Sequence, residues 1–583
     1  MPDLPLYKRC VLFGALAWLA LLPARAPDAL LPVCQLQGSG FDSPYTGLPV
    51  RVRGVVYADQ DQASPAGFYL QQTGCDARPE TSDGIFVRLS APGEIVQPAD
   101  RVEVSGIVQE YYGQTELLAG PAAVQRLSDG SPLPPPVELD PPFDAGQARL
   151  YFERLEGMRV SLSDGRVVGP TDSRGRTWLA RAGLGLAHIL SGDPDRTGAV
   201  ICTGGGMQRL QAAAAGDRAA GLSGPLSYDF GVYCLEPFEA FVHTPAVPAT
   251  ILPPPGAPRL ATFNLGGLFD TTDDPLTDDE VLSYTEYRRR VRKLAQALHG
   301  ALGEPAIVVV QEVESLPVLL ELVSPPYILA VYRAVLVEGP DRRGIDTGLL
   351  YRPDQVRLLE AWTRQACTGL QDGLEPDGNG DLQNPANTLT CDRDGDGVLD
   401  GSRLFSRPPL AARLQLSADG GTGQELWLIA NHFKSRKEDT PWNAYTAARR
   451  AEQGAFVAGL AREILAAHPG AALAVLGDLN DLPGSPALRP LAALGFEDLL
   501  NRLGPAQQYT YIYQGVAQPL DHILLRPSTG LIAGLPAAAR INADYPYSLA
   551  ANTASLLRAS DHDPLSVVIT PPACRLALPL VFK

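Results

Sequence analysis

Apolar and polar residues alternate along the first part of the 583-residue chain. A repeat of two residues is typical of short antiparallel strands, each with one buried face. Gly, Pro and Asp separate the alternating runs, which occupy residues 50–59, 67–72, 84–89 and 100–112. The pattern predicts a small β barrel or sandwich at residues 36–130.

Two proline-rich stretches divide the chain, at residues 131–143 and 245–258. Proline cannot continue a helix or a central strand, and proline-rich segments act as stiff spacers. We therefore place domain boundaries there. Between them, strand and turn patterns predict a second β-rich domain at residues 144–246.

The region at residues 259–571 mixes two periodicities. Apolar strand-like runs alternate with two stretches, 286–300 and 444–468, in which apolar residues recur every three or four positions. That spacing indicates amphipathic helices packed on a sheet. The region is therefore predicted to be an α/β domain. Its strand-like runs lie at 259–265, 306–313, 348–353, 425–433, 471–479, 521–527 and 563–570.

The first 26 residues differ from the rest. Lys8 and Arg9 precede a short apolar run, and small residues follow it. This order is typical of a secretory signal peptide, and a single N-terminal anchor helix is the alternative. Loss of the leader removes three basic residues and one acidic residue, so the formal charge changes from −17 to −19. That charge gives no support to nucleic-acid binding by charge alone, because affinity for phosphate backbones comes from Lys and Arg.

Seven cysteines remain after the leader, and in an oxidising compartment they are expected to form disulfides. Cys574 is the odd one, in a tail at 572–583 that could be a final strand or a surface-sorting element. No CxxC pair occurs among them, so no structural zinc is expected. The pairs expected are Cys202–Cys234, Cys367–Cys391 and Cys34–Cys75.

In the third region, successive apolar runs end in polar residues. A buried carboxylate without a partner costs several kcal/mol or shifts its pKa until it is neutral. One Asp or Asn at a strand end is usually a turn cap, but six such ends together favour a shared site. Hard oxygen donors with two histidines suit a Mg²⁺-type centre and acid–base chemistry on a phosphate ester. The residues are Asn264, Glu312, Glu314, Asn431, His432, Lys434, Asp478, Asn480, Asp521, His522, Asp561, His562 and Asp563.

The ordered motifs TFNL, QEVE, NHFKS, GDLND, LDHILL and SDHDP resemble those of the endonuclease/exonuclease/phosphatase superfamily, to which deoxyribonuclease I belongs. The resemblance implies an α+β four-layer sandwich at 259–571, in which helices flank two packed mixed sheets. It places the active site at one end of the sandwich. Residues 36–89 resemble the OB-fold-like domain that precedes this catalytic domain in secreted bacterial nucleases. Such a fold can hold nucleic-acid strands or serve as a passive spacer.

The resemblance also implies roles for individual residues. Asp478 and Asn480 match residues that activate and orient the attacking water, and Asp478 could also reach a second metal. His562 matches a histidine that contacts the scissile phosphate, with Asp521 holding its ring and raising its pKa. His432 matches a candidate acid for the departing oxygen, and Asp346 is one candidate partner for it. The positions that bind Mg²⁺ or Mn²⁺ are matched by Asn264, Glu312 and Asp561.

The remaining polar residues are open to structural interpretations. Lys434 could touch phosphate or face solvent, and structural roles are favoured for His522 and Glu314. A turn cap suffices for Asp481. Docking of a polyanion on this acidic chain would need a local basic cluster, and the candidates are residues 286–293 and 432–437.

A departure from the family pattern lies at residues 367–401, an insertion bracketed by Cys367 and Cys391. Acidic residues alternate there around Gly397 in the manner of the first nine positions of a calcium loop. The glutamate expected at position twelve is absent, because Arg403 stands there. The insertion is predicted to bind a structural Ca²⁺, and a solvated acidic turn is the alternative. The ligands would be Asp392, Asp394, Asp396 and Asp400.

These features predict a secreted or cell-surface, divalent-metal-dependent nuclease that hydrolyses phosphodiester bonds of extracellular DNA, with RNA as a further candidate substrate. One alternative is a phospholipid or sphingomyelin phosphodiesterase. Another is a cell-surface binding protein with an inactive nuclease-like domain, although the complete polar set argues against it. The sequence shows no exposed aromatic hairpin for membrane insertion, so no stable insertion is expected.

Overall fold

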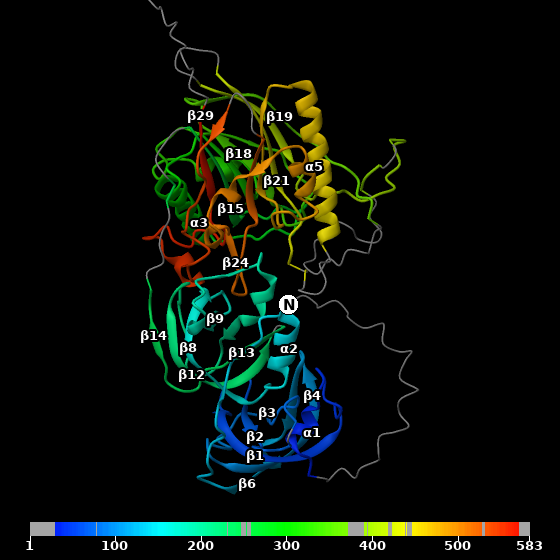
Figure 1. Cartoon of the computed structure of the whole chain (residues 1–583), viewed down its shortest axis with the longest axis vertical. Helices are drawn as coiled ribbons and strands as arrows, with labels where there is room; N and C mark the ends of the chain where they lie inside the picture. Colours follow the sequence, from blue (N-terminus) through cyan, green and yellow to red (C-terminus); the bar gives the residue numbers. More distant parts are fainter. Residues whose placement is uncertain are drawn as a thin grey trace, which may run out of the picture. The chain divides into compact units, whose positions relative to one another are not determined.

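The computed structural model describes residues 30–76, 78–229, 231–246, 252–253, 258–370, 390–392, 395–417, 423–437, 439, 446–526 and 531–570 (Figure 1). The expected leader at 1–26, the tail at 572–583, Cys574 and Asp394 lie outside these residues. Strands predominate and helices are few. Over the described part of the chain, no helix is both long enough and apolar enough to cross a membrane.

The chain forms two compact units. Unit 1 holds the residues up to Val137 together with 153–160 and 225–232. Unit 2 holds 138–152, 161–224 and the chain from Tyr233 onwards.

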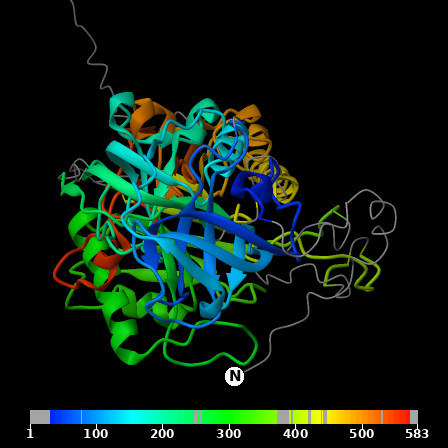
Figure 2. The ribbon, with the colours of Figure 1, turned by 90° about the horizontal axis from the view of Figure 1, so that it is seen from below.

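Unit 1 is a closed β barrel (Figure 2, blue to light blue). Its strands pair in the order β1-β2-β3-β5-β4, and β4 pairs back with β1. The neighbours are antiparallel except β3 and β5, which are parallel. Alternate residues point inward, as the period of two predicted, and fill a core of valine, leucine, isoleucine and phenylalanine. The elements are α1 (Val33–Gln37), β1 (Pro49–Gln60), β2 (Gly67–Gln71), β3 (Gly84–Leu89), β4 (Arg101–Tyr111), β5 (Gln114–Ala119), η1 (Pro121–Ala123) and β6 (Val124–Ser128).

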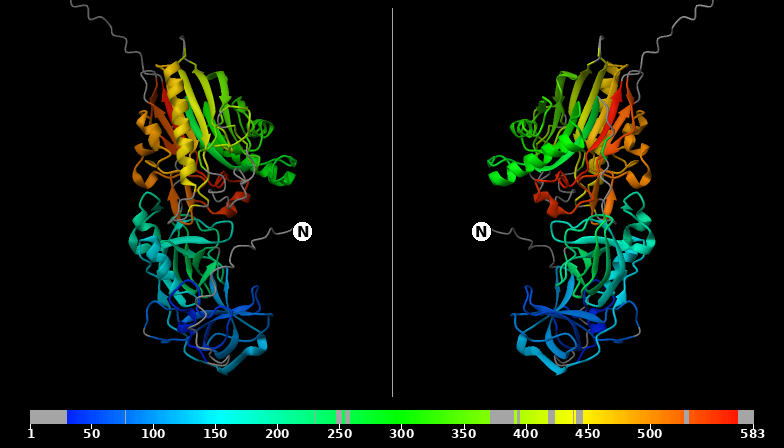
Figure 3. Two further views of the ribbon diagram at one scale, coloured as in Figure 1. Left: turned by 90° about the vertical axis from the view of Figure 1, so that its right-hand side faces the viewer. Right: turned by 90° about the vertical axis from the view of Figure 1, so that its left-hand side faces the viewer.

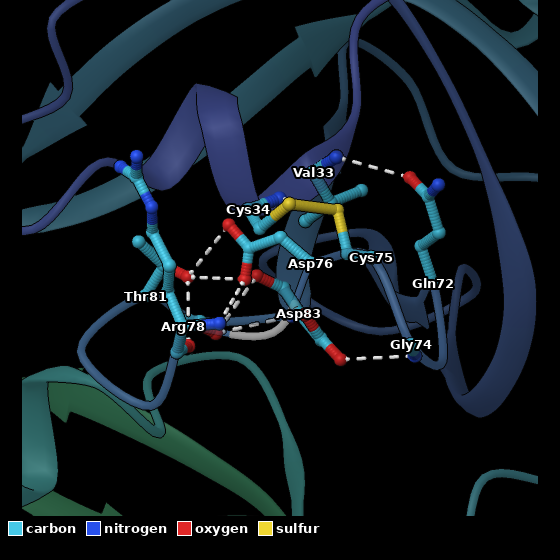
Figure 4. Close-up of a disulfide and its surroundings, with 11 residues drawn as sticks. Val33, Cys34, Gln72, Gly74, Cys75, Asp76, Arg78, Thr81 and Asp83 are labelled. Atoms are coloured by element: carbon cyan, nitrogen blue, oxygen red, sulfur yellow. Dashed lines mark hydrogen bonds between the residues drawn. A yellow bond between two sulfur atoms is a disulfide. The ribbon is translucent and has the colours of Figure 1, made fainter.

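All three predicted disulfides are present. Figure 4 shows the one that joins α1 to the loop after β2. Cys34 is bonded to Cys75, and beside this bond the backbone of Val33 donates to the Gln72 side chain at 3.1 Å. The other two bonds are Cys202–Cys234 and Cys367–Cys391.

The second β-rich region forms a ring of strands with the same circular order as the barrel of unit 1. The order is β8-β9-β11-β13-β12, and β12 pairs back with β8. Here too the strands that are third and fifth in chain order, β11 and β13, are neighbours in the ring and parallel. The elements are β7 (Val137–Glu138), α2 (Ala145–Glu153), β8 (Arg159–Gly169), β9 (Thr177–Arg181), β11 (Ile201–Thr203), β12 (Arg218–Asp229), β13 (Val232–Leu235) and β14 (Val242–Thr244). The intervening β10 (Ile189–Leu190) pairs elsewhere, as described below.

Unit 2 also contains two larger sheets. The first has the order β17-β18-β16-β15-β29-β27, with β28 beside β29. Its strands are β15 (Arg259–Leu268), β16 (Ile307–Val313), β17 (Arg333–Leu336), β18 (Asp346–Tyr351), β27 (Ile532–Ala533), β28 (Ala537–Ala538) and β29 (Leu565–Thr570). The second has the order β19-β20-β21-β22-β26-β23. Its strands are β19 (Val356–Thr363), β20 (Leu410–Leu416), β21 (Glu425–His432), β22 (Ala472–Asp478), β23 (Glu497–Asp498) and β26 (Asp521–Arg526).

Each of these sheets has two buried faces. One face of each contributes to a shared apolar core that contains residues of both sheets. The outer face of the first sheet packs on α3 (Tyr284–Gln296), η4 (Ala297–Ala301) and α4 (Leu316–Leu322). The outer face of the second packs on α5 (Ala447–Ala467) and α6 (Arg489–Ala493). Figure 3 shows the yellow α5 and the green helices on opposite sides of the strands.

Local sequence explains these elements. Along β22, Leu473 and Val475 face the helices while Ala474 and Leu476 face the other sheet, so the whole strand is apolar. The helix α3 begins at Ser283, whose hydroxyl accepts from the Glu286 backbone while donating to the Glu286 carboxylate. The predicted helices at 286–300 and 444–468 correspond to α3 and α5, and each predicted strand of the third region is found.

The Cys34–Cys75 bond generates a stability prediction. It closes a segment of 41 residues, and a cross-link of that span should stabilise the barrel by about 4 kcal/mol through the entropy of the unfolded chain. We expect the Cys34→Ser/Cys75→Ser variant to lose about that free energy of unfolding in unit 1, measured by hydrogen exchange of the barrel strands. Cys574→Ser, which leaves the three bonds intact, is the control. Unchanged exchange in the double variant would contradict the prediction.

Candidate active site

The face of the second sheet that lines the shared core is apolar along most of its length and becomes polar at one end. Successive side chains of a strand point to opposite faces of the sheet, so every second residue belongs to the same face. Because β26 runs antiparallel to β22, the first residue of β26 lies beside the last residue of β22. The inward residues run Leu428, Ala430 and His432 on β21, Ala474, Leu476 and Asp478 on β22, and Asp521, Ile523 and Leu525 on β26.

The first sheet shows the same change at the same end. On β15 the inward series passes from Leu260 to Thr262 and Asn264, and on β16 it passes from Val309 to Gln311. Gln311 and Thr262 are fully buried and bond to each other at 3.1 Å. The predicted strand-end residues therefore converge because two parallel strand pairs, β15–β16 and β21–β22, deliver them to one end of the shared core.

Glu312 reaches this end through a bulge. The register between β16 and β18 shifts between Gln311 and Val313, and Glu312 has a φ of 59°, which is uncommon for a residue with a side chain. Strict alternation would place Val313 on the inner face with Val309, and the extra residue moves it instead to the face that packs on the helices. Asn480 also has a positive φ, 49°. Backbone strain of this kind is often concentrated at functional sites.

His562 and Asp521 form the central pair of the site. The Nδ1 atom of His562 lies 2.7 Å from Oδ2 of Asp521, and both side chains are buried. Burial alone would lower the pKa of His562, but the carboxylates of Asp521 and Asp478 outweigh it and raise that pKa well above its usual value. The imidazole is therefore held in the cationic form, with its other nitrogen 4.0 Å from Oδ2 of Asp478.

Asp478 is buried among other acidic groups. Burial and the neighbouring Asp521 and Glu312 raise its pKa to about 7, although His562 opposes the shift. Its Oδ2 accepts from Nδ2 of Asn264 at 3.0 Å, and its Oδ1 accepts from the backbone of Asn480 at 3.0 Å. Asn264 and Asn480, two of the predicted site residues, thus both donate to this carboxylate. The side-chain amide of Asn480 donates to the carbonyl of Phe433 at 3.2 Å.

Glu312 and Asp561 are two further carboxylates of the site, and both interact electrostatically with Arg290 of α3. Oε1 of Glu312 lies 3.4 Å from Nδ2 of Asn264. Burial would raise the pKa of Asp561, but the charges of His562, Arg558 and Arg290 lower it below its usual value. Arg290, a residue of the 286–293 cluster that donates to the carbonyls of Leu265 and Gly266, interacts electrostatically with both carboxylates.

His432 faces the same site and lies 3.6 Å from Oδ2 of Asp478 through Nε2. Its Nδ1 atom is buried and has no hydrogen-bond partner among the described residues. Burial, Arg407 and Arg343 lower its pKa well below the usual value, so the ring is neutral. The candidate partner Asp346 instead accepts from the backbone of Gly339 at 2.8 Å, and no contact joins it to His432 among the described residues.

Other polar residues of the motifs support the site from behind. His522 is fully buried between Asp498, at 2.8 Å, and the carbonyl of Asp481, at 2.9 Å. Asp481 caps the backbone of Leu482, as expected, but its other oxygen also pairs with the buried Arg450 at 3.1 Å. A turn cap was therefore an incomplete account of Asp481. Asp563 binds Arg540 at 2.9 Å and accepts from three consecutive backbone amides, at residues 541–543.

Lys434 and the insertion complete the predicted set. Lys434 is only 6% exposed, so the solvent-facing interpretation of this residue is wrong. In the insertion, Asp392 accepts from the backbones of Gly395 and Gly397, and Asp396 accepts from the backbone of Val398. Asp400 is exposed.

Sequence reasoning missed an aromatic contact with His562. The ring of Tyr511, on the short strand β24 (Tyr511–Tyr513), lies 4.6 Å from the His562 ring at an interplanar angle of 27°. β24 forms a hairpin with β25 (Val516–Gln518) and ends in Tyr513, which is 46% exposed. This hairpin was not singled out from the sequence. The sequence signal for this hairpin was the alternation of Tyr511 and Tyr513 just before a Gln-Gly turn.

The donor set fits a divalent cation. Among the described residues, one atom each of Asp478, Asp521 and His562 lie within 4.8 Å of one another, and of these the two carboxylates are the donors, because the cationic ring of His562 has no lone pair to offer. The second such group contains the disulfide Cys34–Cys75. Oδ1 of Asp521 is buried without a hydrogen-bond partner in the described part of the chain. A free carboxylate oxygen beside Asp478 and Glu312 is a hard donor in an acidic environment, which suits Mg²⁺ or Mn²⁺ rather than a softer metal.

The buried His522–Asp498 pair generates a pH prediction. Burial would lower the pKa of His522, but Asp498 and the Asp481 carbonyl raise it to about 9. A histidine with a raised folded-state pKa stabilises the protein fully below its unfolded pKa of about 6.5 and loses that contribution as pH rises through about 9. The free energy of unfolding of unit 2 should therefore fall by up to about 3 kcal/mol more in the wild type than in His522→Gln between pH 6.5 and 10.

Denaturant unfolding at the two pH values measures this difference. His468→Gln, which leaves the pair intact, should keep the wild-type pH dependence. If His522→Gln and the wild type lost the same free energy over this range, the pair would not be the titrating element.

Comparisons with known proteins agree with the motifs. Residues 259–374 match the model described as the Endonuclease/Exonuclease/phosphatase family, and residues 138–248 match a domain of unknown function (DUF8508). No curated protein matches the chain.

Solved structures that resemble the chain include an endonuclease/exonuclease/phosphatase from Bacteroides vulgatus, at 18% identity and a TM-score of 0.35, covering 54% of this chain and 98% of that one. They also include the human Nocturnin catalytic domain, at 16% identity and a TM-score of 0.34, where the match covers 55% of this chain and 96% of that one. A third is D. rerio TDP2 complexed with a single-strand DNA product, at 18% identity and a TM-score of 0.33, where the match covers 54% of this chain and 98% of that one. At these scores no substrate follows for this chain. By the family match, residues 259–374 of the chain belong to an endonuclease/exonuclease/phosphatase family domain.

Proposed function

We propose that the chain is a divalent-metal-dependent phosphodiesterase that hydrolyses nucleic acid, DNA first and RNA as a further substrate. The observation that carries the proposal is the convergence of Asp478, Asp521 and His562 at one end of the core between two sheets. A hydrolase of phosphate esters needs a cationic contact for the phosphate, a group that activates water, and oxygen donors for a metal. These three residues, with Asn264 and Glu312, supply all of them.

The geometry supports the following division of labour. The cationic ring of His562, held by Asp521, contacts a non-bridging phosphate oxygen, on which charge increases in the transition state. Asp478 accepts a proton from the attacking water, since its pKa of about 7 is suited to a general base. Asn480 orients Asp478 through its backbone amide. His432 lies 3.6 Å from Asp478, and because its ring is neutral it would donate a hydrogen bond to the leaving oxygen rather than act as its acid.

Glu312, Asp561 and Asn264 are the residues that would hold Mg²⁺ or Mn²⁺, and Asp478 and Asp521 present further oxygens to the same space. The ion would neutralise charge on the phosphate and on the leaving oxygen. Burial and the neighbouring carboxylates of Asp521 and Glu312 raise the pKa of Asp478 in the protein alone, and a bound cation would offset both effects.

The fold arrangement supports the family's architecture. We propose that the two sheets and their helices form the four-layer α+β sandwich, because one core lies between the sheets and two further cores lie under the helices. We also propose that unit 1 is an OB-like barrel, on the basis of its closed strand order and its single parallel pair. A secreted location is supported by the N-terminal pattern of the sequence and by the three disulfides.

The alternative substrates are separated by one assay. The purified chain is incubated with plasmid DNA, RNA and sphingomyelin vesicles in the presence of Mg²⁺ or Mn²⁺, and then with a chelator. We expect cleavage of nucleic acid that stops when the metal is removed. Cleavage of lipid without cleavage of nucleic acid would overturn the proposal, and cleavage that persists in chelator would overturn the metal requirement.

Two substitutions test the assigned residues. Asp478→Asn and His562→Gln should each reduce the rate of DNA cleavage by about 100-fold or more, because each removes a proton-transfer or charge-stabilising group. Both variants should keep the wild-type circular dichroism spectrum. Asp273→Asn, an exposed acidic residue of the same region, should keep the wild-type rate. Near-normal turnover in either site variant would refute the assignment.

The insertion is proposed to bind a structural Ca²⁺. Asp392 and Asp396 already support tight turns through backbone amides, and the loop is closed by the Cys367–Cys391 bond. Saturating Ca²⁺ should raise the Tm of the wild type by a few degrees, since an ion that binds only the folded state stabilises it. The Asp394→Ala/Asp396→Ala variant should show no such increase by calorimetry. Equal responses of the two proteins to Ca²⁺ would remove the proposal.

A further inference from the structure

We propose that the β24–β25 hairpin carries a stacking subsite for an unpaired nucleobase, with Tyr513 as its exposed surface. The inference rests on the proposed nuclease function and deepens it, because it specifies which part of the substrate lies beside the site and favours a single strand. It also gives a role to the second β-rich region, which holds this hairpin in place.

Three rings form a continuous stack that leads out of the candidate active site. Tyr511 lies 4.6 Å from His562 at 27°, and Tyr513 lies 6.4 Å from Tyr511 at 11°. The two tyrosines are two residues apart on β24, so they share one face of the hairpin. Tyr511 is half-buried, whereas Tyr513 is 46% exposed. The stack therefore ends in an open aromatic face near the phosphate contact.

The turn of the hairpin is fixed by its own backbone and by the second β-rich region. Gln514 and Gly515 have φ values of 48° and 79°, as in a two-residue turn with both central residues left-handed. A Cβ on Gly515 would lie 2.7 Å from Cβ of Trp178 and 2.8 Å from Val200. The tip thus packs so closely on β9 and the segment before β11 that only glycine fits.

The edge of the hairpin is held as well. The short strand β10 pairs in parallel with β25, Ile189 opposite Val516 and Leu190 opposite Ala517. The backbone of Ser191 also donates to the carbonyl of Ala517 at 2.9 Å. A two-stranded hairpin alone is marginally stable, and a third strand provides the order that it lacks. β10 therefore converts the hairpin into a three-stranded sheet.

A buried polar network also joins the second β-rich region to the segments on either side of the hairpin. His188, just before β10, bonds to Asp544 at 2.9 Å, and the hydroxyl of Tyr509 donates to the same carboxylate at 2.9 Å. Arg540 stacks on the ring of Tyr509 and pairs with Asp563, the residue that follows His562. The hairpin and the His562 segment are thus held in one framework. Fixed rings lose little entropy on binding a ligand, which favours affinity.

A nucleobase is the ligand class that this surface fits. An aromatic side chain provides about 1–3 kcal/mol of stacking per base in single-strand binding and tolerates any base. The chain has a formal charge of −17, so it gains little from contacts between its overall charge and a phosphate backbone. Stacking provides affinity that does not depend on that charge. Bases inside a duplex are covered by their neighbours, so the subsite takes an unpaired base.

Steady-state kinetics of Tyr513→Ala test the subsite. Two substrates of equal length are compared with Mg²⁺ present: an unpaired oligodeoxynucleotide and an oligomer of abasic residues. We expect KM for the first to rise about 5- to 100-fold with little change in kcat, and no change for the second, since only the first has bases to stack. Tyr513→Trp should restore the wild-type KM. Equal KM values for wild type and Tyr513→Ala, or equal losses on both substrates, would overturn the proposal.

The controls separate this inference from the proposed function. Phe143→Ala, which removes an aromatic ring of the same 46% exposure elsewhere on unit 2, should leave KM unchanged. Binding of the labelled oligodeoxynucleotide is also measured by fluorescence anisotropy. If the wild type cleaved neither substrate but Tyr513→Ala still weakened binding, the nuclease function would fail and the subsite would stand. Cleavage by the wild type with unaltered binding and kinetics in Tyr513→Ala would leave the function and remove the subsite.

The support from the second β-rich region has its own matched pair. Gly515→Ala places a Cβ against Trp178 at a φ of 79°, and should raise KM for the unpaired oligodeoxynucleotide as Tyr513→Ala does. Gly175→Ala introduces the same backbone strain at a φ of 78° in open space, and should leave KM unchanged. Equal effects of the two substitutions would show that packing on Trp178 does not position the hairpin.

Discussion

The hydrogen bond between His562 and Asp521 is the interaction on which the rest of the candidate site depends. Asp478 and Asp521 are both buried, and a buried carboxylate is costly unless it is paired. The imidazolium of His562 bonds directly to one carboxylate and lies 4.0 Å from the other. Burial, together with the negative charges of Asp521 and Glu312, raises the pKa of Asp478, and a bound cation would offset this uncompensated charge.

Several distant segments hold that pair in position. Asp563 fixes the chain next to His562 by accepting from successive backbone amides and binding Arg540. His522, on the strand that begins with Asp521, is locked between Asp498 and the carbonyl of Asp481. The second β-rich region contributes through β10 and Trp178, which together immobilise the hairpin whose Tyr511 covers the His562 ring. A region matched only to a domain of unknown function is thus part of the framework of the site.

Much of this arrangement could be predicted from the sequence because strand ends and side-chain alternation obey simple rules. The apolar runs before Asp478 and His432 predicted buried strands, and polar residues at their ends predicted a shared edge. The bulge at Glu312 could not be predicted, because its left-handed backbone depends on pairing between β16 and β18. The partner of Asp481 was missed because Arg450 lies 31 positions away on a helix. The role of β10 was missed because two residues carry no periodic signal.

The central claim is that the polar end of the core between the sheets is a metal-dependent phosphodiesterase centre. The most direct test is anomalous diffraction from crystals of the whole chain soaked in Mn²⁺. We expect a Mn²⁺ peak within bonding distance of carboxylate oxygens from Glu312, Asp478, Asp521 or Asp561, and loss of that peak in crystals of the Glu312→Gln/Asp478→Asn variant. A well-diffracting soaked crystal with Mn²⁺ only in the 392–400 loop, or nowhere, would contradict it.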